Sequence, residues 1–83
     1  MKIIKYYKDN CPGCEQLAVL SAAEGYEFDQ TVHVMNELNG AERKKLRIMS
    51  VPTVILFNDN GEEVDRISGI NPIKLAFFFS KKG

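Results

Sequence analysis

Residues 6–14 read Tyr6-Tyr7-Lys8-Asp9-Asn10-Cys11-Pro12-Gly13-Cys14. Residues 2–7, which lead into this segment, are mostly β-branched and aromatic without a breaker, and this predicts a strand. Pro12 is favoured in the first turn of a helix and Gly25 is typical of a helix end, so a helix is expected between them. The two cysteines are therefore expected where a strand passes into a helix.

The spacing of Cys11 and Cys14 favours a redox-active pair. With two cysteines and one histidine, the chain cannot supply four such ligands to a structural zinc ion. A disulfide across so short a loop removes little entropy from the unfolded chain, so a purely structural bond is disfavoured. The spacing alone leaves a metal-binding or an inert role open as the alternative.

The start of the predicted helix favours ionisation of the first cysteine. Unpaired backbone N–H groups and the positive end of the helix dipole face the Cys11 sulfur and stabilise its thiolate. We expect Cys11, with a depressed pKa, to attack a substrate disulfide, and Cys14 to attack the mixed disulfide that results. Pro12 is expected to hold this geometry, and Gly13 to leave room for the backbone of a partner.

The remainder of the chain alternates strands and helices. Further elements are predicted at 27–35 (strand), up to about 46 (short helix), 53–57 (strand buried on both faces), 62–67 (hairpin strand) and from 71 onward (helix). The resulting order, β-α-β-α-β-β-α, predicts an α/β fold in which a four-stranded mixed sheet is flanked by three helices. Because no linker or repeat interrupts residues 1–83, a single domain is expected.

The charge balance gives no sign of a nucleic-acid or membrane partner. Lys plus Arg and Asp plus Glu both number 11, so the formal net charge is zero. No apolar run approaches the roughly 18 residues of a transmembrane helix, and the first residues lack the long apolar region of a signal peptide. We therefore expect a cytoplasmic protein, and a monomer.

A second motif lies in the second half of the chain. Val51-Pro52-Thr53 opens the predicted central strand, and Gly69 follows the last predicted strand. A Cys-x-x-Cys after a strand, together with an apolar-Pro-Thr step and this glycine, resembles the thioredoxin/glutaredoxin superfamily over essentially the whole chain. The resemblance implies a thioredoxin fold without the extra N-terminal strand and helix of full-length thioredoxins.

The resemblance also implies roles for the second motif. Pro52 is expected to follow a cis peptide bond, which only proline adopts at low cost, whereas a plain proline at a strand start is the alternative. The loop is expected to pack against the cysteines, and the Val51 backbone to pair with the substrate chain. No bound cofactor or metal is implied, and the Cys11–Cys14 disulfide would receive electrons from a thioredoxin reductase or from glutathione.

The two halves of the chain resemble different branches of the superfamily. Residues 6–14 resemble a glutaredoxin, in which a lysine at the position of Lys8 binds a glutathione carboxylate. Asn10 stands in place of the thioredoxin tryptophan, and Lys5 in place of an acidic residue on the first strand. Residues 46–57 and 60–69 resemble thioredoxin, and they lack the glycine pair and acidic residue that help glutaredoxins hold glutathione.

These features are compatible with three functions. The leading one is a thiol–disulfide oxidoreductase that acts as an electron carrier between a reductase and disulfide-containing protein substrates. The second is a glutathione-dependent glutaredoxin, with Lys8 and the Val51 backbone holding the tripeptide. The third, of another class, is a non-catalytic binding module with the thioredoxin fold.

Three other positions carry expectations about burial. His33 is expected on the polar face of an alternating strand, without a catalytic role. Met49 fits an apolar docking surface and a core position equally well. Phe77, Phe78 and Phe79 cannot all face inward from one helix, and Phe78 is expected to be the partly exposed one.

Overall fold

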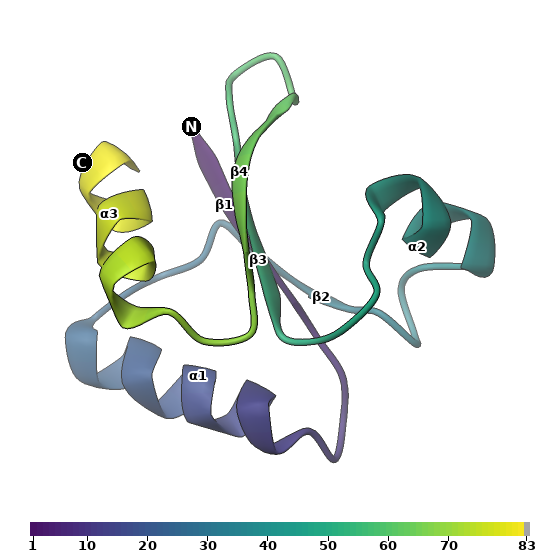
Figure 1. The fold of residues 1–83 in the computed structure, drawn as a ribbon, viewed down its shortest axis with the longest axis horizontal. Helices are drawn as coiled ribbons and strands as arrows, with labels where there is room; N and C mark the ends of the chain where they lie inside the picture. The colour runs from purple at the N-terminus through teal and green to yellow at the C-terminus, as the bar shows by residue number, and fades with distance from the viewer. Residues whose placement is uncertain (83) are drawn as a thin grey trace.

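Seven elements build the structure, a computed structural model that describes residues 1–82 (Figure 1). They are β1 (Lys2–Tyr7), α1 (Pro12–Glu24), β2 (Gln30–His33), α2 (Gly40–Leu46), β3 (Thr53–Phe57), β4 (Glu63–Ser68) and α3 (Pro72–Lys82). The strands form one sheet in the order β2-β1-β3-β4, in which β1 is parallel to β2 and antiparallel to β3, and β3 is antiparallel to β4. The predicted element order and the four-stranded mixed sheet are confirmed.

The central strand β3 is buried on both faces. Val54 and Leu56 contact the core beneath α1 and α3, whereas Ile55 points to the opposite face and packs in a second cluster near α2. This double burial explains the nearly continuous apolar run of β3, because each of its alternating faces meets a hydrophobic layer. Figure 1 shows the arrangement, with α1 and α3 on one side of the sheet and α2 on the other.

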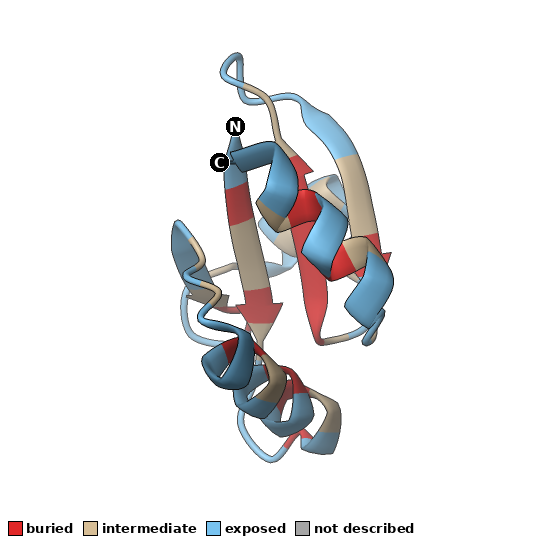
Figure 2. Ribbon diagram, turned by 90° about the vertical axis from the view of Figure 1, so that its left-hand side faces the viewer, coloured by how far each residue is buried: buried red, intermediate tan, exposed pale blue. Residues whose placement is uncertain are grey.

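The helix α3 is anchored by Leu75 and Phe78. Both side chains lie in the larger core cluster, and Phe78 is completely buried, whereas 54% of Phe77 is exposed. The expectation that Phe78 is partly exposed is therefore wrong. Leu75 faces the sheet, and Phe78, three positions further on, lies on the same side of the helix. Phe77 is therefore turned away from the sheet. Figure 2 shows the buried residues concentrated in the strands and on the inner sides of the helices.

The strand β2 is shorter than the predicted 27–35. It begins at Gln30 and ends at His33, where the chain turns and the N–H groups of Asn36 and Glu37 donate to the His33 carbonyl oxygen. The segment before β2 is held by aromatic contacts with Phe79: Tyr26 stacks on its ring at 4.3 Å and Phe28 meets its edge at 5.4 Å. The directions of the Tyr26 and Phe28 side chains are therefore set by their contacts with Phe79, and not by the alternation expected of a strand.

Asp29 ties the beginning of the chain to its end. Its carboxylate accepts hydrogen bonds from the Ile3 backbone N–H and from Lys82 Nζ, each at 2.7 Å. Burial by itself raises the pKa of Asp29, but the hydrogen bonds from Lys82 and Ile3 outweigh it and hold the pKa below its ordinary value. A carboxyl group of this kind stabilises the fold above its unfolded pKa, and the stabilisation is lost as the pH falls through the folded pKa.

We expect Asp29→Asn to lower the melting temperature at pH 7 and to have a smaller effect near pH 2, because the wild-type carboxyl loses its stabilising charge as the pH falls from its unfolded pKa through its depressed folded pKa. The measurement is thermal unfolding of both proteins, followed by circular dichroism, at the two pH values. An equal decrease at both would show that the charge of Asp29 does not contribute to stability.

Candidate functional site

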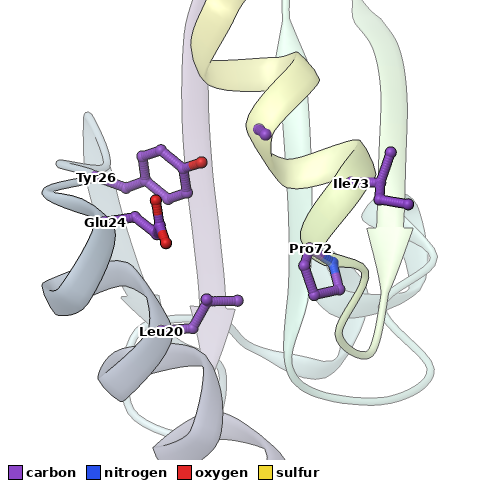
Figure 3. Close-up of a pocket in the computed structure, with 6 residues that line it drawn as sticks. Leu20, Glu24, Tyr26, Pro72 and Ile73 are labelled. Carbon is purple, nitrogen blue, oxygen red and sulfur yellow. The ribbon is translucent and has the colours of Figure 1, made fainter.

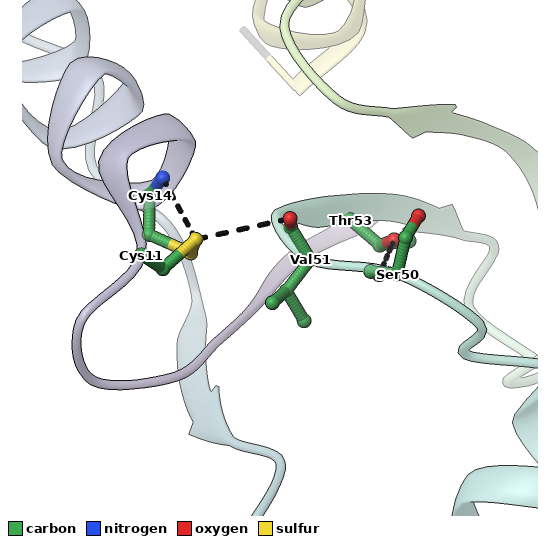
Figure 4. The surroundings of a disulfide bond; sticks show 5 residues. All are labelled: Cys11, Cys14, Ser50, Val51 and Thr53. Atoms are coloured by element: carbon green, nitrogen blue, oxygen red, sulfur yellow. Dashed lines mark hydrogen bonds between the residues drawn. A yellow bond between two sulfur atoms is a disulfide. The ribbon is translucent and has the colours of Figure 1, made fainter.

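The disulfide Cys11–Cys14 lies where β1 is followed by α1 (Figure 4). Cys11 is the N-cap of α1, with the extended backbone typical of that position, and Pro12 occupies the first turn. The Cys11 sulfur accepts a hydrogen bond from the Cys14 N–H at 3.2 Å, so one of the unpaired donors at the helix start points at it. Only 6% of Cys11 and 8% of Cys14 are exposed.

The loop before β3 lies against this disulfide. The Val51–Pro52 peptide bond is cis, and the carbonyl oxygen of Val51 lies 3.8 Å from Cys11 Sγ (Figure 4). Two hydrogen bonds hold the loop: Thr53 Oγ1 donates to the Ser50 carbonyl at 2.8 Å, and the Gly69 N–H donates to the Pro52 carbonyl at 2.8 Å. The glycine after β4 thus supports the loop that faces the cysteines.

Gly13 makes room for Pro52. A Cβ atom built at Gly13 would lie 3.1 Å from Pro52 Cδ, closer than most side chains tolerate. The expected room for a partner's backbone is thus taken up, at least in part, by a proline of the same chain. The structure brings Cys11, Pro12, Gly13 and Cys14 of the first motif together with Val51 and Pro52 of the second.

A cleft of about 270 Å³ opens beside the disulfide. Its lining comes from the second half of β1, the loop after it and the first turns of α1: Lys5, Tyr7, Lys8, Asp9, Asn10, Cys11, Cys14, Glu15 and Ala18. Lys8 is exposed at the edge of this cleft, as its proposed contact with a substrate carboxylate would require. Asn10 has a φ of 52°, a left-handed conformation that asparagine adopts more readily than a bulky side chain.

A second hollow lies between α1 and α3 (Figure 3). Leu20, Glu24 and Tyr26 line one side, and Pro72, Ile73 and Ala76 line the other. None of the residues expected at the redox site borders this hollow, so we place the candidate site at the disulfide and not here. Among residues 1–82, no cluster of three or more histidine, cysteine or acidic side chains is arranged to bind a metal ion.

His33 differs from its sequence-based expectation. Only 7% of it is exposed, its ring meets the edge of Tyr7 at 5.1 Å between centroids, and its Nε2 lies 3.1 Å from a carboxylate oxygen of Asp9. His33 Nδ1 accepts a hydrogen bond from the Asn36 N–H. The expectation of a polar, solvated face is wrong because the loop that precedes Cys11 covers this end of β2.

Known proteins match the chain over most of its length. It is 36% identical over 75 residues to the SPbeta prophage-derived thioredoxin-like protein YosR of Bacillus subtilis, a match that covers 90% of each protein. The chain belongs to the family of thioredoxin-like proteins. It is also 27% identical over 75 residues to the thioredoxin of Staphylococcus haemolyticus, covering 87% of the chain and 71% of that thioredoxin. No family model matches the sequence.

Solved thioredoxin structures share the fold. The thioredoxin of Malassezia sympodialis superimposes with a TM-score of 0.76 at 20% identity, covering 98% of the chain and 74% of that protein. Thioredoxin 1 of Thermosipho africanus superimposes with a TM-score of 0.72 at 20% identity, covering 99% and 93%. A thioredoxin fold, thioredoxin relatives and a Cys-x-x-Cys disulfide together make the chain a thiol–disulfide oxidoreductase, and they favour the thioredoxin interpretation over the glutaredoxin one.

Two features of this thioredoxin site were missed from the sequence. The pairing of His33 with Asp9 joins the end of β2 to the loop before Cys11. Lys5 was noted only as a replacement for an acidic residue, yet it lines the cleft together with both cysteines. The period-two spacing of Lys5 and Tyr7 on β1 carried the signal, because it places both on the face that α1 covers.

Proposed function

We propose that this chain reduces disulfide bonds of protein substrates by dithiol exchange, with Cys11 as the nucleophile and Cys14 as the resolving residue. The observation that carries the proposal is the position of the Cys11 sulfur at the start of the helix α1, 3.2 Å from the Cys14 N–H. A hydrogen bond from a backbone donor and the positive end of the helix dipole both stabilise a thiolate there.

The reaction proceeds in two exchanges. The Cys11 thiolate attacks one sulfur of the substrate disulfide, and a Cys11–substrate bond forms while the second substrate sulfur leaves as a thiolate. Cys14 then loses its proton to solvent and attacks the Cys11 sulfur, which forms the Cys11–Cys14 disulfide and releases the first substrate sulfur. Two electrons pass to the substrate, its two thiolates take up protons from water, and the chain is left in the oxidised form that the structure describes.

The loop around the cis proline supplies the proposed contact with the substrate chain. Val51 lies beside Cys11, so a substrate backbone that runs along Val51 brings its disulfide to the nucleophile. Pro12 is exposed next to Cys11, and Met49, 94% exposed, extends the apolar surface near Val51. Met49 is therefore available for docking, and the alternative core position does not apply.

Electrons are proposed to come from a thioredoxin reductase, with no cofactor bound to the chain itself. The thioredoxin relatives support this source over glutathione, although Lys8, to which the glutaredoxin resemblance gives a glutathione carboxylate as partner, lines the cleft beside the disulfide. We further propose that residues 1–83 act as a single monomeric domain in the cytoplasm. In the part of the chain that the structure describes, no helix has the length and apolar character needed to cross a membrane.

The test is NADPH consumption with insulin as the disulfide substrate, driven either by thioredoxin reductase or by glutathione with glutathione reductase. We expect turnover with thioredoxin reductase, because the relatives of this chain are thioredoxins and thioredoxin-like proteins, and little with glutathione. A parallel assay with dithiothreitol as the reductant removes the dependence on the reductase chosen.

Each contrary outcome identifies an alternative. Turnover with glutathione alone, lost in Lys8→Met, would establish the glutaredoxin function and place the glutathione carboxylate at Lys8. No acceleration of insulin reduction by dithiothreitol would overturn the oxidoreductase proposal and favour a binding module.

A further inference from the structure

A half-buried lysine lines the cleft beside the disulfide. Lys5 lies in the middle of β1, between Thr31 of β2 and Val54 of β3, and it shares the cleft with Cys11 and Cys14. Lysine is rarely buried without an anionic partner. Among residues 1–82, the carboxylates that lie within ion-pair distance of a cation pair with other groups, and none pairs with Lys5.

Two aromatic rings hold the Lys5 ammonium group in place. Its Nζ lies 5.5 Å from the centroid of the Tyr7 ring and 5.3 Å from that of Phe28, both within the range of a cation–π contact. The lysine side chain is long enough that its charge usually extends into water. The two rings instead hold the charge beside them, and burial lowers the pKa of Lys5 because no anion compensates for the lost solvent.

In the oxidised form the cysteines cannot supply an anionic partner to Lys5, because a disulfide carries no charge. Reduction changes this: a donor dithiol becomes a disulfide and gives the cysteine pair two electrons and one proton, while its second proton goes to solvent, so the pair becomes one thiol and one thiolate. The new negative charge arises at residues that line the same cleft as Lys5. An ammonium group in a partly desolvated cleft stabilises this thiolate without stabilising the disulfide.

We propose that Lys5 is the charge partner of the active-site thiolate and raises the reduction potential of the Cys11–Cys14 pair. This inference rests on the proposed function, since it assumes that the pair cycles between disulfide and dithiol. Lys5 is a positioning residue in this scheme: it acts on the substrate only through the charge of the cysteines. Its effect favours the thiolate and makes the chain a weaker reductant than it would be without Lys5.

The other charged groups at the cleft are more exposed than Lys5. Lys8 and Asp9 come from the loop after β1 and Glu15 comes from α1, and all three are exposed to solvent. From β2, His33 faces Asp9. Water and salt screen exposed charges more strongly than buried ones, and Asp9 and Glu15 oppose Lys8 in sign. Lys5 therefore sets the field at the thiolate to a greater extent than its exposed neighbours.

The test replaces Lys5 by methionine, which removes the charge and keeps an unbranched side chain, and by arginine, which keeps the charge. Lys2→Met is the matched control, because Lys2 lies exposed on the same strand and outside the cleft. Two quantities are measured: the equilibrium of the cysteine pair in dithiothreitol redox buffers, and the pH of thiolate formation from ultraviolet absorbance. Lys5→Gln serves as a second neutral variant in case Lys5→Met does not fold.

We expect the neutral variants to move the equilibrium about tenfold towards the disulfide, equivalent to about 30 mV, and to shift thiolate formation upward by about one pH unit. Lys5→Arg and Lys2→Met should stay within about twofold of the wild type, which is less than a third of a pH unit. Unchanged values in both neutral variants, or an equal change in Lys5→Arg, would overturn the role of the Lys5 charge. If the wild type also fails to reduce insulin with dithiothreitol, the proposed function itself fails, whatever the variants show.

Discussion

Cys11→Ser abolishes the reduction of insulin disulfides, with an expected loss of about a thousandfold or more. A serine hydroxyl at this position can accept the Cys14 N–H but is not ionised at neutral pH, so it cannot open a substrate disulfide. The assay is the rate of insulin reduction by dithiothreitol in the presence of each protein. Activity comparable to the wild type would contradict the assignment of Cys11 as the nucleophile.

Cys14→Ser is the matched control, because it removes the other sulfur of the same bond. This variant retains Cys11 and carries out the first exchange, but it cannot release the substrate. It should therefore accumulate a covalent mixed disulfide, visible as a band of higher mass on a gel run without reductant and absent when a reductant is added. The same adduct in Cys11→Ser and not in Cys14→Ser would reverse the roles of the two cysteines.

Phe78→Ala lowers the free energy of unfolding by about 3–5 kcal/mol, the range found when a large aromatic side chain is removed from a core. Phe78 has no exposed surface and contacts the cluster that joins α3 to the sheet, so its removal leaves a cavity that this cluster cannot easily fill. Because small domains have total stabilities of about 5–15 kcal/mol, the variant should be near the limit of folding at room temperature. Urea denaturation followed by circular dichroism measures the difference.

Phe77→Ala provides the comparison for the same residue type on the same helix. Of Phe77, 54% is exposed, and Lys81 Nζ lies 4.7 Å from the centroid of its ring. We expect a change of about 0.5 kcal/mol or less from this substitution. Similar losses for the two variants would show that α3 is not docked in the register described, whereas a folded Phe77→Ala beside an unfolded Phe78→Ala is the strongest form of the expected result.

The prediction from sequence was most accurate where local signals agree with each other. The apolar run of β3, the proline at the start of α1 and the glycine at its end each restrict the backbone within a few residues, and the corresponding elements have the predicted bounds to within a residue. The second strand was predicted too long, because its alternation continues past the point where the Asn36 and Glu37 N–H groups turn to the His33 carbonyl oxygen.

Burial of individual side chains was harder to predict. Helical spacing shows that three successive phenylalanines cannot all face inward, but it leaves the rotation of α3 open until Leu75 and Phe78 meet the sheet. His33 was assigned to a solvated face because the alternation of β2 says nothing of what covers that face. Asp9 and Tyr7 cover it, from a loop and a strand that are distant from His33 in the sequence.

Local signals along the chain place most of the strands and helices, the helix start that carries Cys11 and Cys14, and the proline motif that resembles the superfamily. These are consequences of backbone preferences and short spacings, which act between neighbouring residues. Folding adds that the Val51 carbonyl oxygen lies 3.8 Å from Cys11 Sγ, that Pro52 fills the space beside Gly13, and that Lys5 lines the same cleft as the cysteines. Such contacts join residues far apart in the chain, and they exist only once packing has fixed how the helices lie on the sheet.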